Sequence, residues 1–142
     1  MNKDFRWEIL VDSVINQVSV DRNTKKAVIS LEDSTTQHWL INFIDVDELM
    51  MVQFTLQSII CEIHLWSSCD DEPACRERLY WNLFGKEPLG EEDLYSFHVD
   101  NALKKMKEGN NVLLEMELIG GGYITVHAKT IFAETTISIG QT

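Results

Sequence analysis

Apolar and polar residues alternate with a period of two along much of the chain, as in strands that bury one face of an antiparallel sheet. Segment 26–32 shows it clearly, because Ala27, Ile29 and Leu31 alternate with less apolar neighbours. The apolar region 50–66 is too long for one strand and is predicted to divide at 55–58. The predicted strands are 5–11, 14–20, 26–32, 39–44, 59–66, 112–119 and 123–132, followed by an apolar run with Ile137 and Ile139.

Polar clusters at 21–24 and 33–36 and an acidic cluster at 45–48 are predicted to be turns between the first strands. Within the later strands, alternation predicts which side chains face the core, with Glu62 and His64 on the opposite side. The predicted core side chains of this half of the sheet are Cys61, Ile63, Leu65, Leu114, Met116 and Leu118.

The middle of the chain has a different character. Pro73 suits an early helical position and Gly85 is a natural stop, so residues 73–84 are predicted to form a helix. Residues 86–96 contain proline, glycine and three consecutive acids, which predicts a surface connection. Phe97 is expected to anchor that connection.

A second helix is predicted over residues 100–108, because Val99, Leu103 and Met106 recur at spacings of four and three and lysines gather near its end. The combined pattern predicts an α+β fold: a mostly antiparallel sheet with two helices in the second half. A chain of this length is expected to form a single domain, residues 1–142.

The glycine run 120–122 could be a phosphate-binding loop, but such a loop needs a helix after it. A predicted strand follows instead, and a Walker-type lysine is absent. Tight reversal between two strands explains the glycines better, so residues 112–132 are predicted to form a hairpin.

Composition indicates an ordinary globular protein except for its net charge of −11. No apolar run has the length of a signal peptide or a membrane span, so a cytoplasmic protein is expected. The three cysteines, Cys61, Cys69 and Cys75, are expected to be free thiols in a reducing compartment. A bridge between Cys69 and Cys75 stays open.

Candidate catalytic and metal-binding residues lack supporting motifs. Glu62 and His64 share a strand face, but the chain has no HExxH and no paired CxxC pattern. Cys69 and Cys75 flank three acids, which oppose thiolate formation, and no GxSxG turn is present. The histidines are therefore expected to be surface or core groups, and neither enzymatic activity, a cofactor nor a metal is expected.

Charge is distributed very unevenly. Between residues 27 and 75 the chain has nine Asp and Glu residues and no Lys or Arg. This excess favours a cationic partner and disfavours nucleic acid or an anionic membrane. Any one acidic cluster can be a solvated loop or a helix cap, but together they create a strong negative field, and nearby aromatic residues could anchor a partner if they are exposed.

The order of parts resembles the small acidic immunity proteins of bacterial contact-dependent inhibition and related polymorphic toxin systems. The resemblance lies in N-terminal strands, the segment FTLQSIICEIHLW, an acidic helical region, and a helix ending in EGN before VLLEMELIGGGYITVHAKTI. It implies a cytoplasmic single-domain inhibitor that binds a cognate toxin, often a basic nuclease, and blocks it stoichiometrically. It transfers no contact residues to this chain.

The expected partner is therefore a basic protein, in the first instance a toxin nuclease domain, bound by a monomer or homodimer. Two other classes of protein stay open: an intracellular adaptor that dimerises through a sheet edge, and a small enzyme whose active site has no recognisable sequence motif. The residues predicted to contact the partner are Trp66, Asp70, Asp71, Glu72, Glu91, Glu92 and Asp93.

Overall fold

The computed structural model describes residues 5–54, 58–67 and 72–136. Within them, six strands form one antiparallel sheet in the order β1-β2-β3-β6-β5-β4, and the longer helices lie between β4 and β5 in the chain. The predicted α+β class is confirmed. The elements are η1 (Trp7–Leu10), β1 (Val14–Asp21), β2 (Lys26–Glu32), β3 (His38–Val52), β4 (Ile60–Ser67), α1 (Glu72–Phe84), α2 (Glu91–Leu94), α3 (Phe97–Gly109), β5 (Val112–Leu118) and β6 (Tyr123–Thr135).

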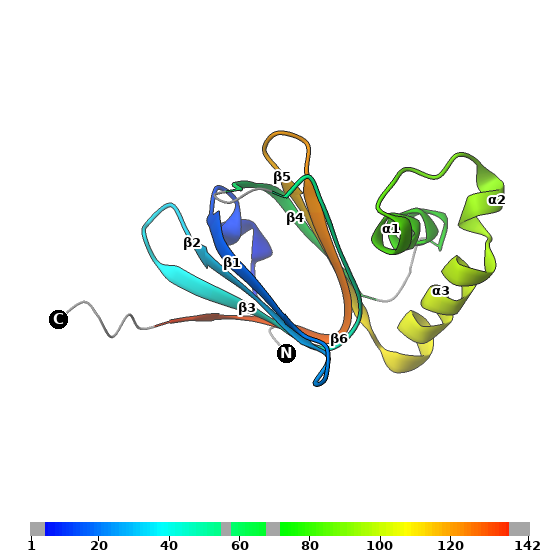
Figure 1. Cartoon of the computed structure of the whole chain (residues 1–142), viewed down its shortest axis with the longest axis horizontal. Coiled ribbons are helices and arrows are strands. Elements are labelled where there is room, and N and C mark those ends of the chain that lie inside the picture. The colour runs from blue at the N-terminus through cyan, green and yellow to red at the C-terminus, as the bar shows by residue number, and fades with distance from the viewer. Residues whose placement is uncertain (1–4, 55–57, 68–71, 137–142) are drawn as a thin grey trace.

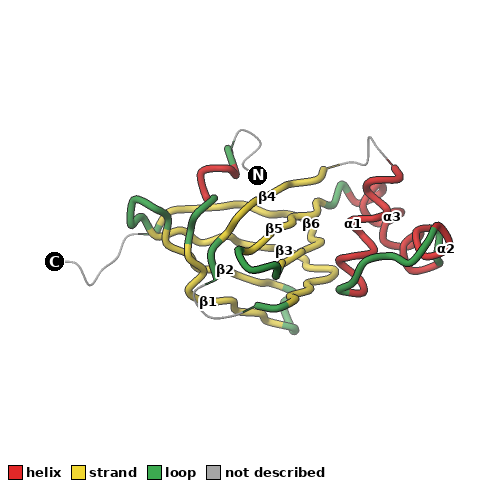
Figure 2. The backbone as a smooth tube through the Cα atoms, turned by 90° about the horizontal axis from the view of Figure 1, so that it is seen from above, coloured by secondary structure: helices red, strands yellow, loops and turns green. Residues whose placement is uncertain are grey.

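The sheet folds back on itself around an apolar interior, while α1, α2 and α3 gather at one end of the molecule (Figures 1 and 2). Its two edges meet near the starts of β1 and β4, where Val14 and Ile59 form an antiparallel bridge. The N–H of Ile15 donates to the carbonyl of Ser58 at 2.8 Å beside this bridge. The sheet is thus a barrel joined at one end, with a core that its inner face surrounds.

The N-terminal segment 5–11 was predicted to be a strand, and this is wrong. It contains the short 3-10 helix η1, in which Trp7 and Leu10 are both buried. Their spacing of three residues brings both side chains to the same side of the turn, toward the barrel core. The ring of Phe5 packs edge-on against Trp7 and Trp39, with centroid distances of 4.9 and 5.5 Å, and this contact fastens η1 to β3.

The acidic cluster 45–48 was predicted to be a turn, and this is also wrong, because β3 continues through it. Asp45 has a φ of 52° and a register shift follows between Val46 and Glu48, so the strand bends without ending. Both Phe43, before the bend, and Leu49, after it, pack in the barrel core. The bend lets one strand serve both sides of the folded sheet.

The predicted core face of β4 and β5 is confirmed with one exception. Ile63 and Leu114 are buried in the barrel core, as are Met116 and Leu118, and Leu65 packs against it. Cys61 is exposed, so its predicted burial is wrong. The reason is a register shift between Ile60 and Glu62, which reverses the alternation and buries Ile60 in its place.

Both predicted helices are confirmed. α3 begins three residues earlier than predicted, with Ser96 as its N-cap accepting from the N–H of Val99 at 3.4 Å. Its C-cap, Asn110, has the left-handed conformation. The predicted connection contains the one-turn helix α2. Phe97 does not anchor it, because its side chain is 73% exposed. Of the described helices, none is both long and apolar enough to span a membrane.

α1 and α3 form a second core on the outer face of the sheet. Leu113 of β5 lies under these helices, although the strand's inner residues belong to the barrel core. β5 is therefore covered on both faces, which simple alternation does not reveal. The second core consists of Cys75, Leu79, Tyr80, Val99, Ala102, Leu103, Met106 and Leu113, with Trp66, Leu83 and Leu94 packed against it.

Free thiols were expected for the cysteines. Cys61 is free, but Cys75 is disulfide-bonded, so the expectation is wrong for Cys75. Cys69 lies outside the described residues.

The hairpin of β5 and β6 is confirmed, and its glycines have distinct roles. Gly120 and Gly121 both have a φ of 101°, which L-residues with a side chain rarely adopt. A Cβ on Gly122 would lie 2.7 Å from the carbonyl oxygens of Val52 and Gln53, so only glycine lets the turn approach the end of β3. Ile137 and Ile139 lie outside the described residues.

Replacing Leu114 by Ala is expected to lower the free energy of unfolding by about 2–5 kcal/mol, because it removes a fully buried side chain from the barrel core. Urea denaturation measures the change. Leu89→Ala is the matched control. Because Leu89 is 91% exposed, the free energy of unfolding of this variant should differ from that of wild type by less than about 0.5 kcal/mol. Equal losses in the two variants would contradict the assigned core.

Candidate functional site

The first group of predicted contact residues comes at the end of β4 and at and just before the start of α1 in the sequence. Trp66, on β4, is half-buried against the helical core, and its indole nitrogen is shielded with no hydrogen-bond partner among the described residues. Asp70 and Asp71 lie outside the described residues. Glu72 is the first residue of α1, and its side chain is not described. Trp66 therefore packs against the helical core, whereas a role for the three acids in partner binding stays a prediction.

The second group, Glu91, Glu92 and Asp93, forms the first three residues of α2. The carboxylate of Asp93 accepts from the N–H of Leu89 at 2.8 Å and so stabilises the turn before the helix. Glu91 and Glu92 are exposed, and no ion pair found among the described residues includes them. Their negative charge therefore acts on solvent and on whatever approaches this surface.

Large apolar side chains are exposed in the same short stretch of chain as these acids, which the sequence interpretation missed. Leu89 is 91% exposed, Phe97 is 73% exposed and Tyr95 is 53% exposed. The rings of Phe97 and Phe84 both contact His98, at centroid distances of 5.8 Å. We define the α2 face as Phe84, Leu89, Glu91, Glu92, Tyr95 and Phe97.

Arg76 fixes α2 in position. Its guanidinium is inside the protein and donates to the carbonyl of Leu94 at 3.1 Å and to the carboxylate of Asp100 at 2.6 Å. It also lies 4.4 Å from the ring centroid of Tyr95, a cation–π arrangement. One buried side chain of α1 therefore joins α1, α2 and α3, and the α2 face is held in place before any partner binds.

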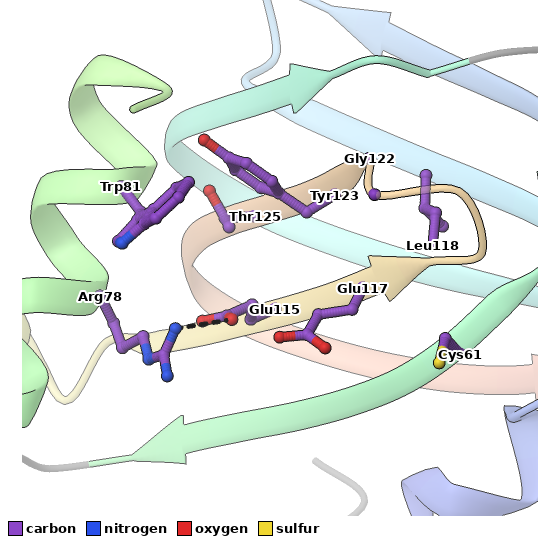
Figure 3. A pocket seen from close by; sticks show the side chains of 10 residues that line it. Cys61, Arg78, Trp81, Glu115, Glu117, Leu118, Gly122, Tyr123 and Thr125 are labelled. Atoms are coloured by element: carbon purple, nitrogen blue, oxygen red, sulfur yellow. Dashed lines mark hydrogen bonds and ion pairs between the residues drawn. The ribbon is translucent and has the colours of Figure 1, made fainter. Parts of the chain in front are cut away.

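A separate cavity of about 330 Å³ lies between α1 and the outer face of the hairpin. Figure 3 shows Arg78 and Trp81 approaching from α1, Glu115 and Glu117 from β5, and Tyr123 from β6. Cys61 of β4 lines it as well, because the bulge that exposes this thiol turns it toward the outer face. The remaining lining residues are Leu118, Gly121, Gly122 and Thr125.

Glu115 is the buried carboxylate of this cavity, at 5% exposure. Arg78 donates to its Oε1 at 3.1 Å, whereas its Oε2 has no partner among the described residues. Burial raises the pKa of Glu115, and the positive charge of Arg78 opposes that rise. Alternation predicts that Glu115 lies on the outer face, but only the position of α1 explains why that face is buried here.

Tyr123 and Thr125 extend the polar row along β6. Burial raises the pKa of Tyr123 to about 12, and its hydroxyl is shielded without a hydrogen-bond partner in the described structure. The Trp81 ring meets the Tyr123 ring edge-on at 5.0 Å. The hydroxyl of Thr125, in contrast, has a hydrogen-bond partner, because the side-chain amide of Asn82 on α1 donates to it at 2.8 Å.

His127 completes this row and is fully buried. Its Nε2 lies 3.3 Å from the amide nitrogen of Asn111, and its Nδ1 lies 3.4 Å from a carboxylate oxygen of Asp47, without hydrogen-bond geometry. Burial lowers the pKa of His127, although the nearby Asp47 acts in the opposite direction; Lys105 lowers it further. The neutral imidazole is therefore favoured in the folded protein.

The predicted pairing of Glu62 and His64 exists, at 3.2 Å, but both side chains are more than half exposed. Cross-strand pairing places Glu62 beside Glu117 and His64 beside Glu115. In the described part of the chain, no three His, Cys, Asp or Glu side chains are grouped so that they could hold a metal ion.

Comparison with known proteins gives no match: no protein-family model, no curated protein and no solved structure is significantly similar to this chain.

His127 should make stability depend on pH in a defined direction. Its pKa is lowered on folding, so below its unfolded value of about 6.5 the unfolded chain binds a proton that the folded protein resists. The stability that neutral His127 contributes is therefore present above that pH and is lost as the pH falls. The free-energy difference between wild type and His127→Gln should shrink between pH 7.5 and pH 5.5.

Urea denaturation at the two pH values measures this difference. His98→Gln, which also removes one imidazole but at an exposed position, is the control. A difference that grows toward low pH would mean that His127 is charged in the folded protein.

Proposed function

We propose that this protein is a toxin-neutralising immunity protein, which binds a basic toxin domain through the α2 face and blocks it stoichiometrically. The observation that carries the proposal is the exposure of large apolar side chains among unpaired carboxylates in a short segment of chain. Of the other residues predicted from the sequence, Asp93 lies in α2 itself, whereas contact through Trp66, Asp70, Asp71 and Glu72 stays a prediction.

Exposed apolar residues support a protein partner. Leu89 and Phe97 leave most of their surface in water, and Tyr95 leaves about half. Scattered exposed apolar residues are normal, but a group with several aromatic members is typical of interaction sites, where such side chains supply most of the binding energy. Burial of this group on a partner would give the α2 face its affinity.

Charge supports a basic partner. Between residues 86 and 100 the chain has one lysine and five carboxylates. Of these carboxylates, Asp100 is paired with Arg76, whereas Glu91 and Glu92 are free to act on a partner. A nuclease must attract polyanions, so the surface around its cleft is basic, and an acidic inhibitor is steered toward the same region.

Rigidity supports tight binding. The contacts of Arg76 with Leu94, Asp100 and Tyr95 hold α2 against its neighbours. A surface that is already ordered loses less conformational entropy on association. The resemblance to immunity proteins agrees with this mechanism, since their inhibition requires binding and no chemical step.

The test measures binding kinetics with the C-terminal domain of the protein that the neighbouring upstream reading frame encodes, which this proposal requires to be a basic toxin domain. Glu91→Gln combined with Glu92→Gln should slow association by about 3- to 10-fold at low salt and weaken its salt dependence. Phe97→Ala should instead raise the dissociation rate by about 30-fold, which corresponds to roughly 2 kcal/mol.

Glu8→Gln combined with Asp12→Asn is the matched control, because it removes the same charge in and next to η1, far from α2 (Figure 1). The association rate of this variant should be much closer to that of wild type than the rate of the Glu91→Gln, Glu92→Gln variant is. Absence of binding at low salt would reject the proposal. So would association and dissociation rates that change neither with salt nor with any of these substitutions. A homodimer of twice the mass on sizing would then favour the adaptor, and a tightly bound small ligand would favour the enzyme.

A further inference from the structure

The cavity under α1 contains two buried polar atoms that the described protein leaves without partners. Oε2 of Glu115 and the hydroxyl of Tyr123 are both shielded from solvent, in residues that are 5% and 9% exposed. A buried acceptor without a hydrogen bond is costly, and a charged one especially so. Arg78 satisfies only the other oxygen of Glu115. Both residues line the cavity, so each offers an unused acceptor to a ligand that carries hydrogen-bond donors.

The charges around the cavity select a cation. Two carboxylates, Glu115 and Glu117, and one guanidinium, Arg78, line it. Glu62 is the cross-strand neighbour of Glu117, and Glu77 lies close enough to act on the titration of Glu115. His64 of β4 is the cross-strand neighbour of Glu115. The acids outnumber the arginine, so a positive group is attracted and an anion is repelled.

The walls of the cavity suit an apolar stem behind that positive group. The rings of Trp81 and Tyr123 and the side chain of Leu118 line it, and Figure 3 shows the two rings next to each other above Glu115. Aromatic faces also attract cations, most strongly when the site is partly desolvated. A volume of about 330 Å³ lies at the small end of the range for ligand pockets.

We propose that this cavity is a binding pocket for a single guanidinium or ammonium group on an aliphatic stem, with Glu115 as the charged acceptor and Tyr123 as the neutral one. The side chain of an arginine or lysine on a partner protein has this chemistry, and so does a free alkyl cation. None of the lining residues belongs to the α2 face. The pocket can therefore be tested on the isolated protein, whatever the outcome for toxin binding.

The test is a titration of the ¹⁵N-labelled protein with n-butylguanidinium and with n-butylurea, its uncharged isostere. Butylguanidinium should shift the indole N–H signal of Trp81 and the amide signal of Gly122 in a saturable way. Butylurea should bind at least about 10-fold more weakly, because it is uncharged and cannot form a charge-assisted hydrogen bond with Glu115. The Trp81 signal is assigned by its loss in Trp81→Phe.

Glu115→Gln should abolish the preference for the cation, and Tyr123→Phe should weaken binding of both probes by about 3-fold or more. Glu108→Gln, an exposed acid on α3, is the control and should bind like wild type. If Glu115→Gln does not fold, Tyr123→Phe and Glu117→Gln carry the test, and both should weaken binding. Absence of saturable shifts, equal binding of the two probes, or a cation preference that survives Glu115→Gln would overturn the proposal.

A third probe, N-acetyl-arginine N-methylamide, distinguishes the two sources of the cation. If the pocket receives a side chain from a partner, this probe should bind within a few-fold of butylguanidinium, because its backbone stays outside. Binding of butylguanidinium alone would support the cation pocket and overturn its use for a protein side chain.

Discussion

Antiparallel pairing between β3 and β6 joins the two sides of the folded sheet. The pairing extends from Trp39 with Thr135 to Val52 with Tyr123. β2 and β1 attach to the free side of β3, whereas β5 and β4 attach to the free side of β6. The bend at Asp45 lies within this pair, between Phe43 and Leu49, which both pack in the barrel core, and the outer edges of the sheet meet where Val14 bridges to Ile59.

The outer face of the hairpin shows how the helices make polar residues tolerable in a buried layer. Glu115, Thr125 and His127 lie under or beside the helices, and each has a partner outside the hairpin strands: Arg78, Asn82 and Asn111 respectively. These contacts offset the loss of hydration that burial causes. They also fix how α1 sits on the sheet. Oε2 of Glu115 and the hydroxyl of Tyr123 lack such a partner, and both residues line the cavity; Nδ1 of His127 also lacks one but lies away from the cavity.

Alternation and helical spacing predicted most elements correctly, because the strands outside the helix-covered hairpin bury one side and the register depends on that pattern. The errors have local causes. The bulge after Ile60 reversed the alternation at Cys61, and the left-handed conformation of Asp45 continued a strand through an acidic cluster. The site was harder to predict: the exposure of Phe97 and the burial of Glu115 both depend on where α1 and α3 lie in three dimensions. Periodicity within one segment holds no such information.

The strand order also has a consequence for synthesis. β3 leaves the ribosome with β2 beside it, but its other edge cannot be paired until β6 has been made, near the end of the described chain. At about 5–20 residues per second this delay lasts several seconds. An unpaired, apolar strand edge can associate with other nascent chains during that time. Substitutions that slow the joining of β3 and β6 should therefore reduce the yield of soluble protein before they reduce the stability of the folded molecule.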